Sequence, residues 1–153
     1  MTSLAFDVLA RLQGKTLATA ESLTGGGIGT VLTTVPGASA VFKGGIISYT
    51  NEVKCRVLGV PEGILDTYGA VSPWTAGHMA SGARKLLNTD YAIAVTGLAG
   101  PGGDEFGHSV GTVFIGYEDA QKAIVKECHF SGNREEVRQQ TIETALKLIL
   151  ENL

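Results

Sequence analysis

The sequence predicts an α/β fold, a single three-layer α/β/α domain with a mixed sheet that spans residues 1–153. Amphipathic segments with helical spacing alternate with short apolar segments along most of the chain, as in strands joined by helices. Two strand-like segments, 110–117 and 123–130, have only a turn near Glu118 between them, which predicts one hairpin. A chain of 153 residues can bury a core of this kind without disulfides.

In the first half of the chain, apolar periodicity and its interruption by glycine and proline predict four helices and two strands. The helices cover residues 3–13, 25–34, 51–58 and 61–68, and the strands cover residues 16–20 and 41–49. Gly44 and Gly45 lie inside the second strand and indicate a bulge or a close approach of another backbone. Tyr49 is expected at the end of this strand, and Lys54 in the first turns of the helix that follows.

In the second half, the pair Ser72-Pro73 predicts the start of a helix that ends near Leu87, because serine is a common N-cap and proline suits the first helical position. The apolar segment 91–95 is typical of a buried central strand. The second hairpin strand alternates charged and apolar residues, as an edge strand does. A helix over residues 133–153 carries its apolar residues on one face.

Charge and composition exclude several classes of function. The net charge is −3 and no Lys/Arg cluster with interleaved aromatic residues occurs, so we expect no nucleic-acid partner. No segment reaches the ~18 apolar residues of a membrane span, so we also expect no membrane partner. Asp7 stands where a signal peptide needs a basic and then an apolar segment, which argues against a signal peptide. Cys55 and Cys128 lie far apart without metal-ligand spacing, which favours a reduced, cytoplasmic protein.

Residues 16–27 combine a strand, a turn that carries Ser22, and three glycines that begin a helix. Such a turn lifts a hydroxyl to the carboxyl edge of a sheet, where ligands bind in α/β folds. Glycine also lets backbone or ligand approach closely. The alternative is that Ser22 and Thr24 merely cap the following helix, as serine and threonine often do. The local sequence leaves both interpretations open.

The standard catalytic and phosphate-binding motifs are absent. The chain has no P-loop, no Gly-x-Gly-x-x-Gly after a strand, and no Gly-x-Ser-x-Gly around Ser22. Its three histidines are scattered, so a Ser-His-Asp triad has no favoured histidine, and His129 is most simply a surface or core residue. Asp104, Glu105 and His108 share a loop and could touch a metal, but their spacing matches no ligand pattern. We expect no metal and no cofactor.

A serine can also be activated by a lysine whose charge is disfavoured by burial, because such a lysine loses its proton near neutral pH. Lys54 is the best candidate, since its helix is expected to begin at the same sheet edge as Ser22. Most lysines are solvated, and the residues alone leave that alternative open for Lys54.

Five blocks, in order and spread over nearly the whole chain, resemble the signature blocks of the CinA C-terminal domain family. They are Thr-Ala-Glu-Ser-Leu-Thr-Gly-Gly at 19–26, Gly-Gly-Ile-Ile-Ser-Tyr-Thr-Asn-Glu-Val-Lys at 44–54, Gly-Ala-Val-Ser at 69–72, Thr-Gly-Leu-Ala-Gly-Pro at 96–101 and Val-Gly-Thr-Val at 110–113. Each block alone is weakly specific, and together they are highly specific. Two positions depart from the pattern: Leu23 replaces a cysteine of many members, and Ser109 replaces a proline often found before the last block.

The resemblance implies hydrolysis of the carboxamide of nicotinamide mononucleotide to nicotinate mononucleotide and ammonia, in pyridine-nucleotide salvage. It implies Ser22 as the nucleophile, Lys54 as its base, and Tyr49 as a third catalytic residue through which the proton could pass. We expect the first N–H groups of the helix after Ser22 to stabilise the oxyanion. The expected substrate-binding residues are Thr24, Gly25, Gly26, Thr96, Gly97, Ala99, Gly100, Gly102 and Arg138.

The phosphate of this substrate needs hydrogen-bond donors, and the backbone of residues 97–103 is suited to supply them. Arg134 and Arg138 are possible additional contacts. Glu135 and Glu136 lie beside them, however, and favour a solvated helix end instead.

A second interpretation is a catalytically silent nucleotide-binding or interaction module of the same family, linked to competence or a DNA-damage response. The joint presence of Ser22, Tyr49 and Lys54 favours the enzyme, because a pure binding module would not need this set. Either way, we expect a small-molecule nucleotide as partner and assembly into a homo-oligomer.

Overall fold

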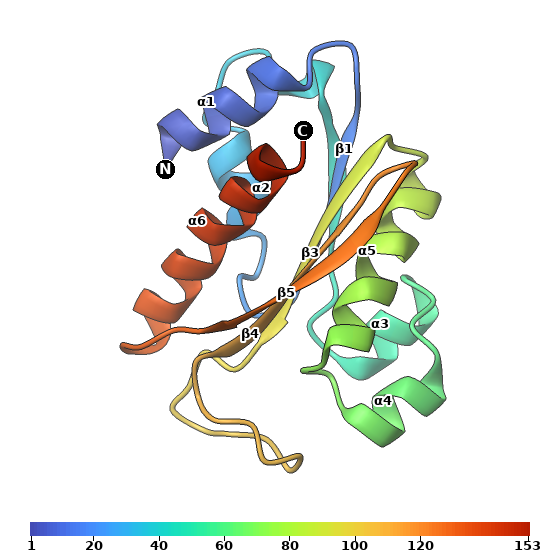
Figure 1. The fold of residues 1–153 in the computed structure, drawn as a ribbon, viewed down its shortest axis with the longest axis vertical. Coiled ribbons are helices and arrows are strands. Elements are labelled where there is room, and N and C mark those ends of the chain that lie inside the picture. The colour runs from blue at the N-terminus through green and yellow to red at the C-terminus, as the bar shows by residue number, and fades with distance from the viewer.

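The computed structural model describes residues 1–153 and contains a five-stranded mixed sheet with the strand order β2-β1-β3-β4-β5 (Figure 1). The strands are β1 (Leu17–Glu21), β2 (Phe42–Ile47), β3 (Tyr91–Gly97), β4 (Thr112–Glu118) and β5 (Ala123–His129). β1 pairs in parallel with β2 and β3, whereas β4 pairs antiparallel with β3 and β5. The predicted mixed sheet and its hairpin are confirmed.

Helices cover both faces of the sheet, which confirms the predicted three-layer architecture (Figure 1). On one face lie α1 (Thr2–Arg11), α2 (Gly27–Leu32) and α6 (Arg134–Glu151), and on the other lie α3 (Asn51–Arg56), α4 (Glu62–Tyr68) and α5 (Pro73–Leu87). Each face has its own apolar core. The larger core unites buried residues of α1, α2 and α6, such as Val8 and Leu146, with the sheet, and the smaller one lies around Met79 of α5.

The region between β1 and β2 differs from the sequence prediction in detail. α2 begins at Gly27 rather than at residue 25, because Gly25 and Gly26 adopt left-handed φ angles of 58° and 101° that lengthen the turn after Ser22. A short 3₁₀ helix, η1 (Ala38–Ala40), lies where no element was expected. Elsewhere the predicted helices and strands differ from the observed ones mainly at their ends.

The glycine pair of β2 marks the close approach that the sequence indicates. Gly45 pairs with Thr19 of β1, and a Cβ atom at residue 45 would lie 2.0 Å from the Thr19 Oγ1. The register between β1 and β2 also shifts just before Gly44. A residue with a side chain at position 45 would therefore push the two strands apart.

The carboxyl ends of β1, β2 and β3 meet at one edge of the sheet because these strands are parallel. From β1 the chain passes through α2 on one face to reach β2, and from β2 it passes through helices on the opposite face to reach β3. The crevice beside β1 is thus a topological switch point, the usual ligand position in open α/β sheets. The long loop between β3 and β4 projects from this same edge, at the bottom of Figure 1.

Two further observations bear on the class of protein. None of the helices combines the length and apolar character that crossing a bilayer requires. Cys55 and Cys128 are both free thiols, so no disulfide contributes to the fold.

Candidate active site

Ser22 lies directly after β1 in a tightly held turn. The N–H of Gly25 donates to the Ser22 carbonyl at 3.0 Å, and the N–H of Gly27 donates to the Thr24 carbonyl at 3.0 Å. The N-cap of α2 is Gly26, which makes no side-chain capping bond, so neither Ser22 nor Thr24 caps this helix in the ordinary way. The interpretation of these residues as simple caps is wrong, and the Ser22 hydroxyl is free for another partner.

That partner is Lys54. Its Nζ lies 2.9 Å from the Ser22 Oγ and 2.5 Å from the carbonyl oxygen of Ser48. Lys54 belongs to α3, whose N-cap Thr50 accepts a hydrogen bond from the Val53 N–H, and its side chain reaches back from this first turn to the end of β1. Only 1% of Lys54 is exposed, so the solvated alternative is wrong.

Burial changes the chemistry of the Lys54 amine. Loss of hydration lowers its pKa from 10.5 to about 8. The Ser48 carbonyl accepts one N–H of the amine, which leaves the lone pair of the neutral form to face the Ser22 hydroxyl. A serine and a lysine in this arrangement can exchange a proton directly, which activates the serine as a nucleophile.

The start of α2 is occupied by Glu21, the last residue of β1. Its carboxylate accepts hydrogen bonds from the Ile28 N–H at 2.8 Å, the Gly29 N–H at 3.0 Å and the Thr24 hydroxyl at 2.6 Å. The first N–H groups of α2 are thus already bound, so the expectation that they stabilise an oxyanion is wrong. The carboxylate of Glu21, the residue before Ser22, accepts the hydrogen bonds of these N–H groups in place of a ligand.

Other donors remain beside the serine. The backbone N–H groups of Leu23 and Thr24, which follow Ser22 directly, make no hydrogen bond within the chain. Backbone N–H groups next to a nucleophile are common oxyanion donors. These two groups replace the α2 terminus as the candidates for that role.

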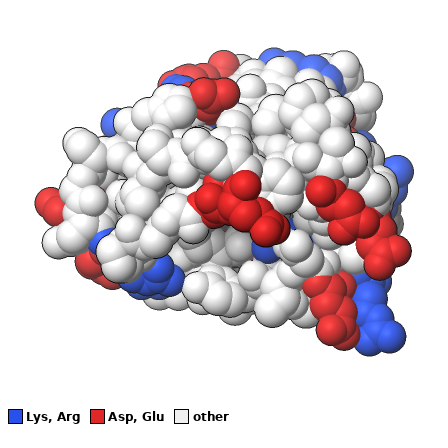
Figure 2. Space-filling model, turned by 90° about the horizontal axis from the view of Figure 1, so that it is seen from below, with Lys and Arg blue, Asp and Glu red and all other residues white.

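Ser22 and Lys54 line a cavity of about 440 Å³. This volume lies within the range of about 300–1,000 Å³ that is typical of small-molecule sites. The cavity wall includes Thr96, Gly97, Ala99, Gly100 and Gly102 among the predicted binding residues. On the face seen from below, charged groups are scattered and an acidic patch borders a hollow (Figure 2); the acidic residues that line the cavity are Asp104 and Glu105.

Tyr49 lines the same cavity but does not join the Ser22–Lys54 pair. It is 59% exposed, and its hydroxyl accepts a hydrogen bond from the Arg134 guanidinium at 3.1 Å. Arg134 also donates to the Gly100 carbonyl at 2.6 Å. The expected convergence of the Tyr49 hydroxyl with the pair is not found, and a direct path from Ser22 to Lys54 takes the place of a relay through tyrosine.

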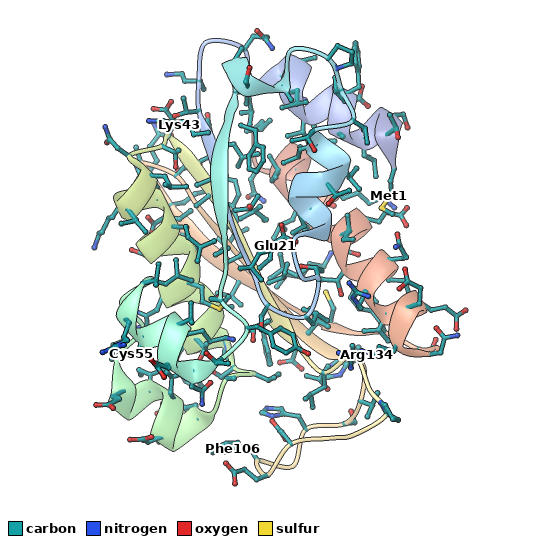
Figure 3. All side chains as sticks on the ribbon, turned by 180° about the vertical axis from the view of Figure 1, so that it is seen from behind. Met1, Glu21, Lys43, Cys55, Phe106 and Arg134 are labelled. Carbon is teal, nitrogen blue, oxygen red and sulfur yellow. The ribbon has the colours of Figure 1, made fainter.

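The two arginines at the start of α6 have separate roles. Arg134 points to the base of the β3–β4 loop and lines the cavity (Figure 3), while it remains exposed at the start of α6. Arg138 lies outside the cavity wall, where it donates to the Leu23 carbonyl at 3.0 Å and the Thr24 carbonyl at 3.3 Å. These bonds hold the turn after Ser22, and a contact of Arg138 with substrate stays a prediction.

Three other predicted binding residues also lie outside the cavity wall. The Thr24 hydroxyl is bound to Glu21, and Gly25 and Gly26 supply the left-handed backbone of the turn. All three shape the turn that carries Ser22, and their contact with substrate stays a prediction.

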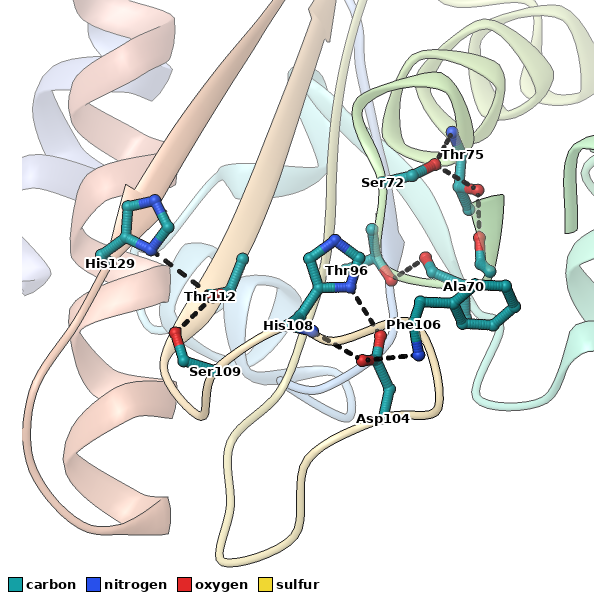
Figure 4. Close-up of polar contacts among 11 residues, drawn as sticks. Ala70, Ser72, Thr75, Thr96, Asp104, Phe106, His108, Ser109, Thr112 and His129 are labelled. Atoms are coloured by element: carbon teal, nitrogen blue, oxygen red, sulfur yellow. Dashed lines mark hydrogen bonds and ion pairs between the residues drawn. The ribbon is translucent and has the colours of Figure 1, made fainter. Parts of the chain in front are cut away.

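The β3–β4 loop is held in place by internal contacts (Figure 4). Asp104 accepts hydrogen bonds from the His108 ring at 2.7 Å and the His108 N–H at 3.0 Å. Burial alone would raise the pKa of Asp104, but these bonds outweigh it and hold the pKa below its usual value. At the other end of the loop, Thr96 donates to the Ala70 carbonyl at 2.7 Å, so its hydroxyl fixes the cavity wall.

The loop presents backbone N–H groups that are free to meet a ligand. The N–H groups of Ala99, Gly100 and Gly102 make no hydrogen bond within the chain. No group of three or more His, Cys, Asp or Glu side chains is arranged to hold a metal ion. His129 is bound to Glu127 at 2.6 Å on the exposed strand β5, in keeping with a surface residue.

Sequence reasoning missed Glu21 and Ser48 as parts of the site. Glu21 lies inside the block at 19–26, directly before Ser22 and a few residues before the predicted helix. This spacing was a usable signal that the Glu21 carboxylate binds the first N–H groups of that helix, as it binds the Ile28 N–H. Ser48 acts through its backbone carbonyl, which no side-chain pattern reveals.

The comparisons with known proteins agree with this fold. The CinA C-terminal domain family matches residues 2–153. A CinA-like protein of Endomicrobium trichonymphae is 43% identical over 154 residues, which cover 96% of this chain and 36% of that protein. A CinA-like protein of Geobacter metallireducens is 48% identical over 138 residues, which cover 90% of this chain and 33% of that protein. The chain thus spans about a third of the length of these curated relatives.

Solved structures match over almost their full length. The competence/damage inducible protein CihA from Agrobacterium tumefaciens has a TM-score of 0.95 at 38% identity, with 98% of this chain and 93% of that chain covered. The competence damage-inducible protein A from Klebsiella pneumoniae has a TM-score of 0.95 at 34% identity, with 98% and 94% covered. These matches show that the chain belongs to the CinA C-terminal domain family.

Proposed function

We propose that this chain hydrolyses the carboxamide of nicotinamide mononucleotide, giving nicotinate mononucleotide and ammonia. The observation that carries the proposal is the contact of 2.9 Å between the Ser22 hydroxyl and the buried Lys54 amine, in the wall of a cavity at the carboxyl edge of the sheet. Burying a lysine costs stability whatever its function. A role as the base for amide hydrolysis explains why this residue is buried against a serine.

The reaction proceeds through a covalent intermediate. Neutral Lys54 takes the proton of Ser22 while the serine oxygen attacks the amide carbon. The N–H groups of Leu23 and Thr24 bind the oxyanion. Lys54 returns the proton to the leaving nitrogen, the C–N bond breaks and ammonia departs. Lys54 then takes a proton from water, whose oxygen attacks the ester carbon, and returns it to the Ser22 oxygen as the C–O bond breaks. The acid that is released ionises to the carboxylate.

The cavity supplies groups for the rest of a nucleotide. Arg134 and the unpaired N–H groups of Ala99, Gly100 and Gly102 provide donors suited to a phosphate. Tyr49 presents an exposed ring at the same cavity, held by Arg134 through its hydroxyl. We therefore assign Tyr49 to the substrate rather than to proton transfer.

The alternative is a nucleotide-binding module without turnover, linked to the competence and damage responses that the names of the Agrobacterium and Klebsiella proteins mention. A binding module needs donors for phosphate but gains nothing from a buried lysine against a serine. Because longer relatives contain this domain as about a third of their length, the reaction is proposed for this chain alone.

Ammonia release from nicotinamide mononucleotide by the purified protein tests the proposal. Wild type should release one ammonia per nicotinate mononucleotide, and Ser22→Ala should lose this activity while still binding the nucleotide. Ser39→Ala, an exposed serine outside the cavity, is the matched control and should keep full activity. Nucleotide binding by the wild type without ammonia release would favour the module.

A further inference from the structure

Glu21 is a buried charged residue for which the proposed reaction provides no step. It is 2% exposed and is not among the residues that line the cavity. Lys54 bonds Ser22, the residue after Glu21, but forms no ion pair with Glu21. A buried carboxylate is retained only where hydrogen bonds replace its hydration, so its three partners define what it does.

Those partners all belong to the turn and helix that follow Ser22. The carboxylate binds the Thr24 hydroxyl, the Ile28 N–H and the Gly29 N–H at 2.6, 2.8 and 3.0 Å. In many α/β proteins a ligand phosphate occupies this position, between a strand, a glycine-rich turn and the start of a helix. Here an internal carboxylate fills it, which excludes an external anion and ties the turn to the end of β1.

The backbone of the same residue supports the other half of the pair. The Glu21 carbonyl accepts a hydrogen bond from the Ser48 N–H at 2.7 Å, and the Ser48 carbonyl accepts one from Lys54. The end of β1 therefore fixes Ser22 through the Glu21 carboxylate and Lys54 through the Glu21 carbonyl.

We propose that Glu21 is a positioning residue for the Ser22–Lys54 pair. Its carboxylate holds the left-handed turn so that the Ser22 hydroxyl faces the Lys54 amine and the N–H groups of Leu23 and Thr24 stay unpaired. This role rests on the proposed function for its reaction, but it concerns the reactivity of Ser22 whatever the substrate.

Two other roles would give different results. If Glu21 only stabilised α2, its replacement would lower the melting temperature and leave kcat intact. If it acted as an electrostatic partner of Lys54, its neutralisation would shift the pH at which the rate rises and leave the high-pH plateau intact. A positioning role lowers the plateau itself, because Ser22 and Lys54 are misaligned at every pH.

Glu21→Gln is the first variant, since it keeps the shape and turns one acceptor into an N–H donor that opposes an α2 N–H. We expect kcat at the high-pH plateau to fall by about 10- to 100-fold, the effect of losing a buried hydrogen bond to a charged group. KM should stay within about twofold, because most of the cavity wall comes from other elements. An unchanged plateau kcat would overturn the proposal.

Thr24→Val removes one donor to the carboxylate and keeps Glu21 itself, so it carries the test if Glu21→Gln does not fold. We expect a smaller fall in plateau kcat, about 3- to 10-fold, with KM retained. Tyr117→Phe is the matched control for stability: this buried hydroxyl donates to Asp119 at 2.6 Å, outside the cavity. It should lower the melting temperature without lowering kcat.

Labelling of Ser22 by phenylmethylsulfonyl fluoride, followed by intact mass, separates this proposal from the choice of substrate. Wild type should be labelled at Ser22, and the labelling rate of Glu21→Gln should be lower by a factor of about 10 or more. Equal labelling rates would overturn the positioning role alone. Wild type that labels but does not hydrolyse the nucleotide would contradict only the proposed substrate, and wild type that does not label at Ser22 would overturn both proposals.

Discussion

At the scale of single residues, Lys54 has the environment of a base rather than of a structural cation. It is buried, bonds a serine and a carbonyl, and has no carboxylate partner that would hold its charge. Its pKa of about 8 leaves a substantial neutral fraction near neutral pH. In the proposed reaction, the reactivity of Ser22 therefore depends on the protonation state of Lys54.

Lys54→Arg tests that link, because arginine keeps the charge but stays protonated in proteins. We expect the single-turnover rate of ammonia release to fall by at least about 100-fold. In the wild type the rate should rise with pH through about 8 and then level off, since only the neutral amine accepts the serine proton. Lys43→Arg, an exposed site on β2, is the control. Near-normal chemistry in Lys54→Arg would exclude Lys54 as the base.

The same lowered pKa predicts a cost in stability. The folded state holds Lys54 with a pKa of about 8 and the unfolded state near 10.5, so between these pH values the unfolded chain binds more protons and stability rises with pH. We expect Lys54→Met to be more stable than wild type at pH 7, and this advantage to shrink by about 3 kcal/mol by pH 10.5. Denaturant unfolding at both pH values measures the difference, and a constant difference would contradict the lowered pKa.

Single residues were predictable where a side chain acts in a local motif and less so where backbone acts. Ser22 and Lys54 could be singled out because a strand end and a helix start meet at one edge of the sheet. The role of Tyr49 could not be predicted, because its hydroxyl bonds Arg134, 85 residues away. The Ser48 carbonyl has no signature in sequence at all.

At the scale of elements, the spacing between β1 and β2 controls where Ser22 and Lys54 stand. Gly45 allows the two strands to approach, and Thr19 fills the space that a side chain at residue 45 would need. The Thr19 hydroxyl is buried and has no hydrogen-bond partner. A good fit between the strands is thus retained at the cost of one unsatisfied polar group.

Gly45→Ala should lower the melting temperature, because the new Cβ would lie 2.0 Å from the Thr19 Oγ1. Adding Thr19→Ala removes that atom and should recover part of the loss, so the two substitutions should couple by about 1 kcal/mol or more in a double-mutant cycle. Additive effects would mean that β1 and β2 separate easily and that their spacing is not fixed by this contact.

Element types and order could be predicted because periodicity, caps and glycines agree with one another along this chain. The start of α2 could not be, because a carboxylate from the preceding strand supplies the bonds that a cap normally provides. Two glycines with left-handed φ delay the helix in a way that composition alone does not fix.

At the scale of the whole molecule, Arg134 connects parts of the chain that are distant in sequence. From the first turn of α6 it bonds Tyr49 after β2 and the Gly100 carbonyl in the β3–β4 loop. The site is thus completed by the last helix, and a substrate phosphate near Arg134 would contact elements from both ends of the chain.

Arg134→Gln should raise the KM for nicotinamide mononucleotide by about 10-fold or more with a smaller effect on kcat, since it removes a charged contact distant from the reacting bond. The matched comparison is nicotinamide riboside, which lacks the phosphate and should show a much smaller change. Arg56→Gln, whose side chain is exposed, should change neither KM. Equal changes for nucleotide and riboside would contradict a phosphate contact.

The arrangement of layers could be predicted from the alternation of elements, whereas the cavity could not. Its walls come from five separate segments of the chain, and only the folded sheet edge brings them together. Arg134 illustrates this, because its hydrogen bonds at the cavity go to Tyr49 and the Gly100 carbonyl, which are distant from it in sequence.

Interception of the acyl-enzyme by hydroxylamine tests most directly the claim that Ser22 and Lys54 hydrolyse an amide through a covalent intermediate. During turnover of nicotinamide mononucleotide, hydroxylamine should compete with water for the ester on Ser22 and yield the hydroxamate of nicotinate mononucleotide. Ammonia release should continue at least as fast, and Ser22→Ala should form no hydroxamate above the uncatalysed rate. An active enzyme that releases ammonia and never yields hydroxamate would contradict the account.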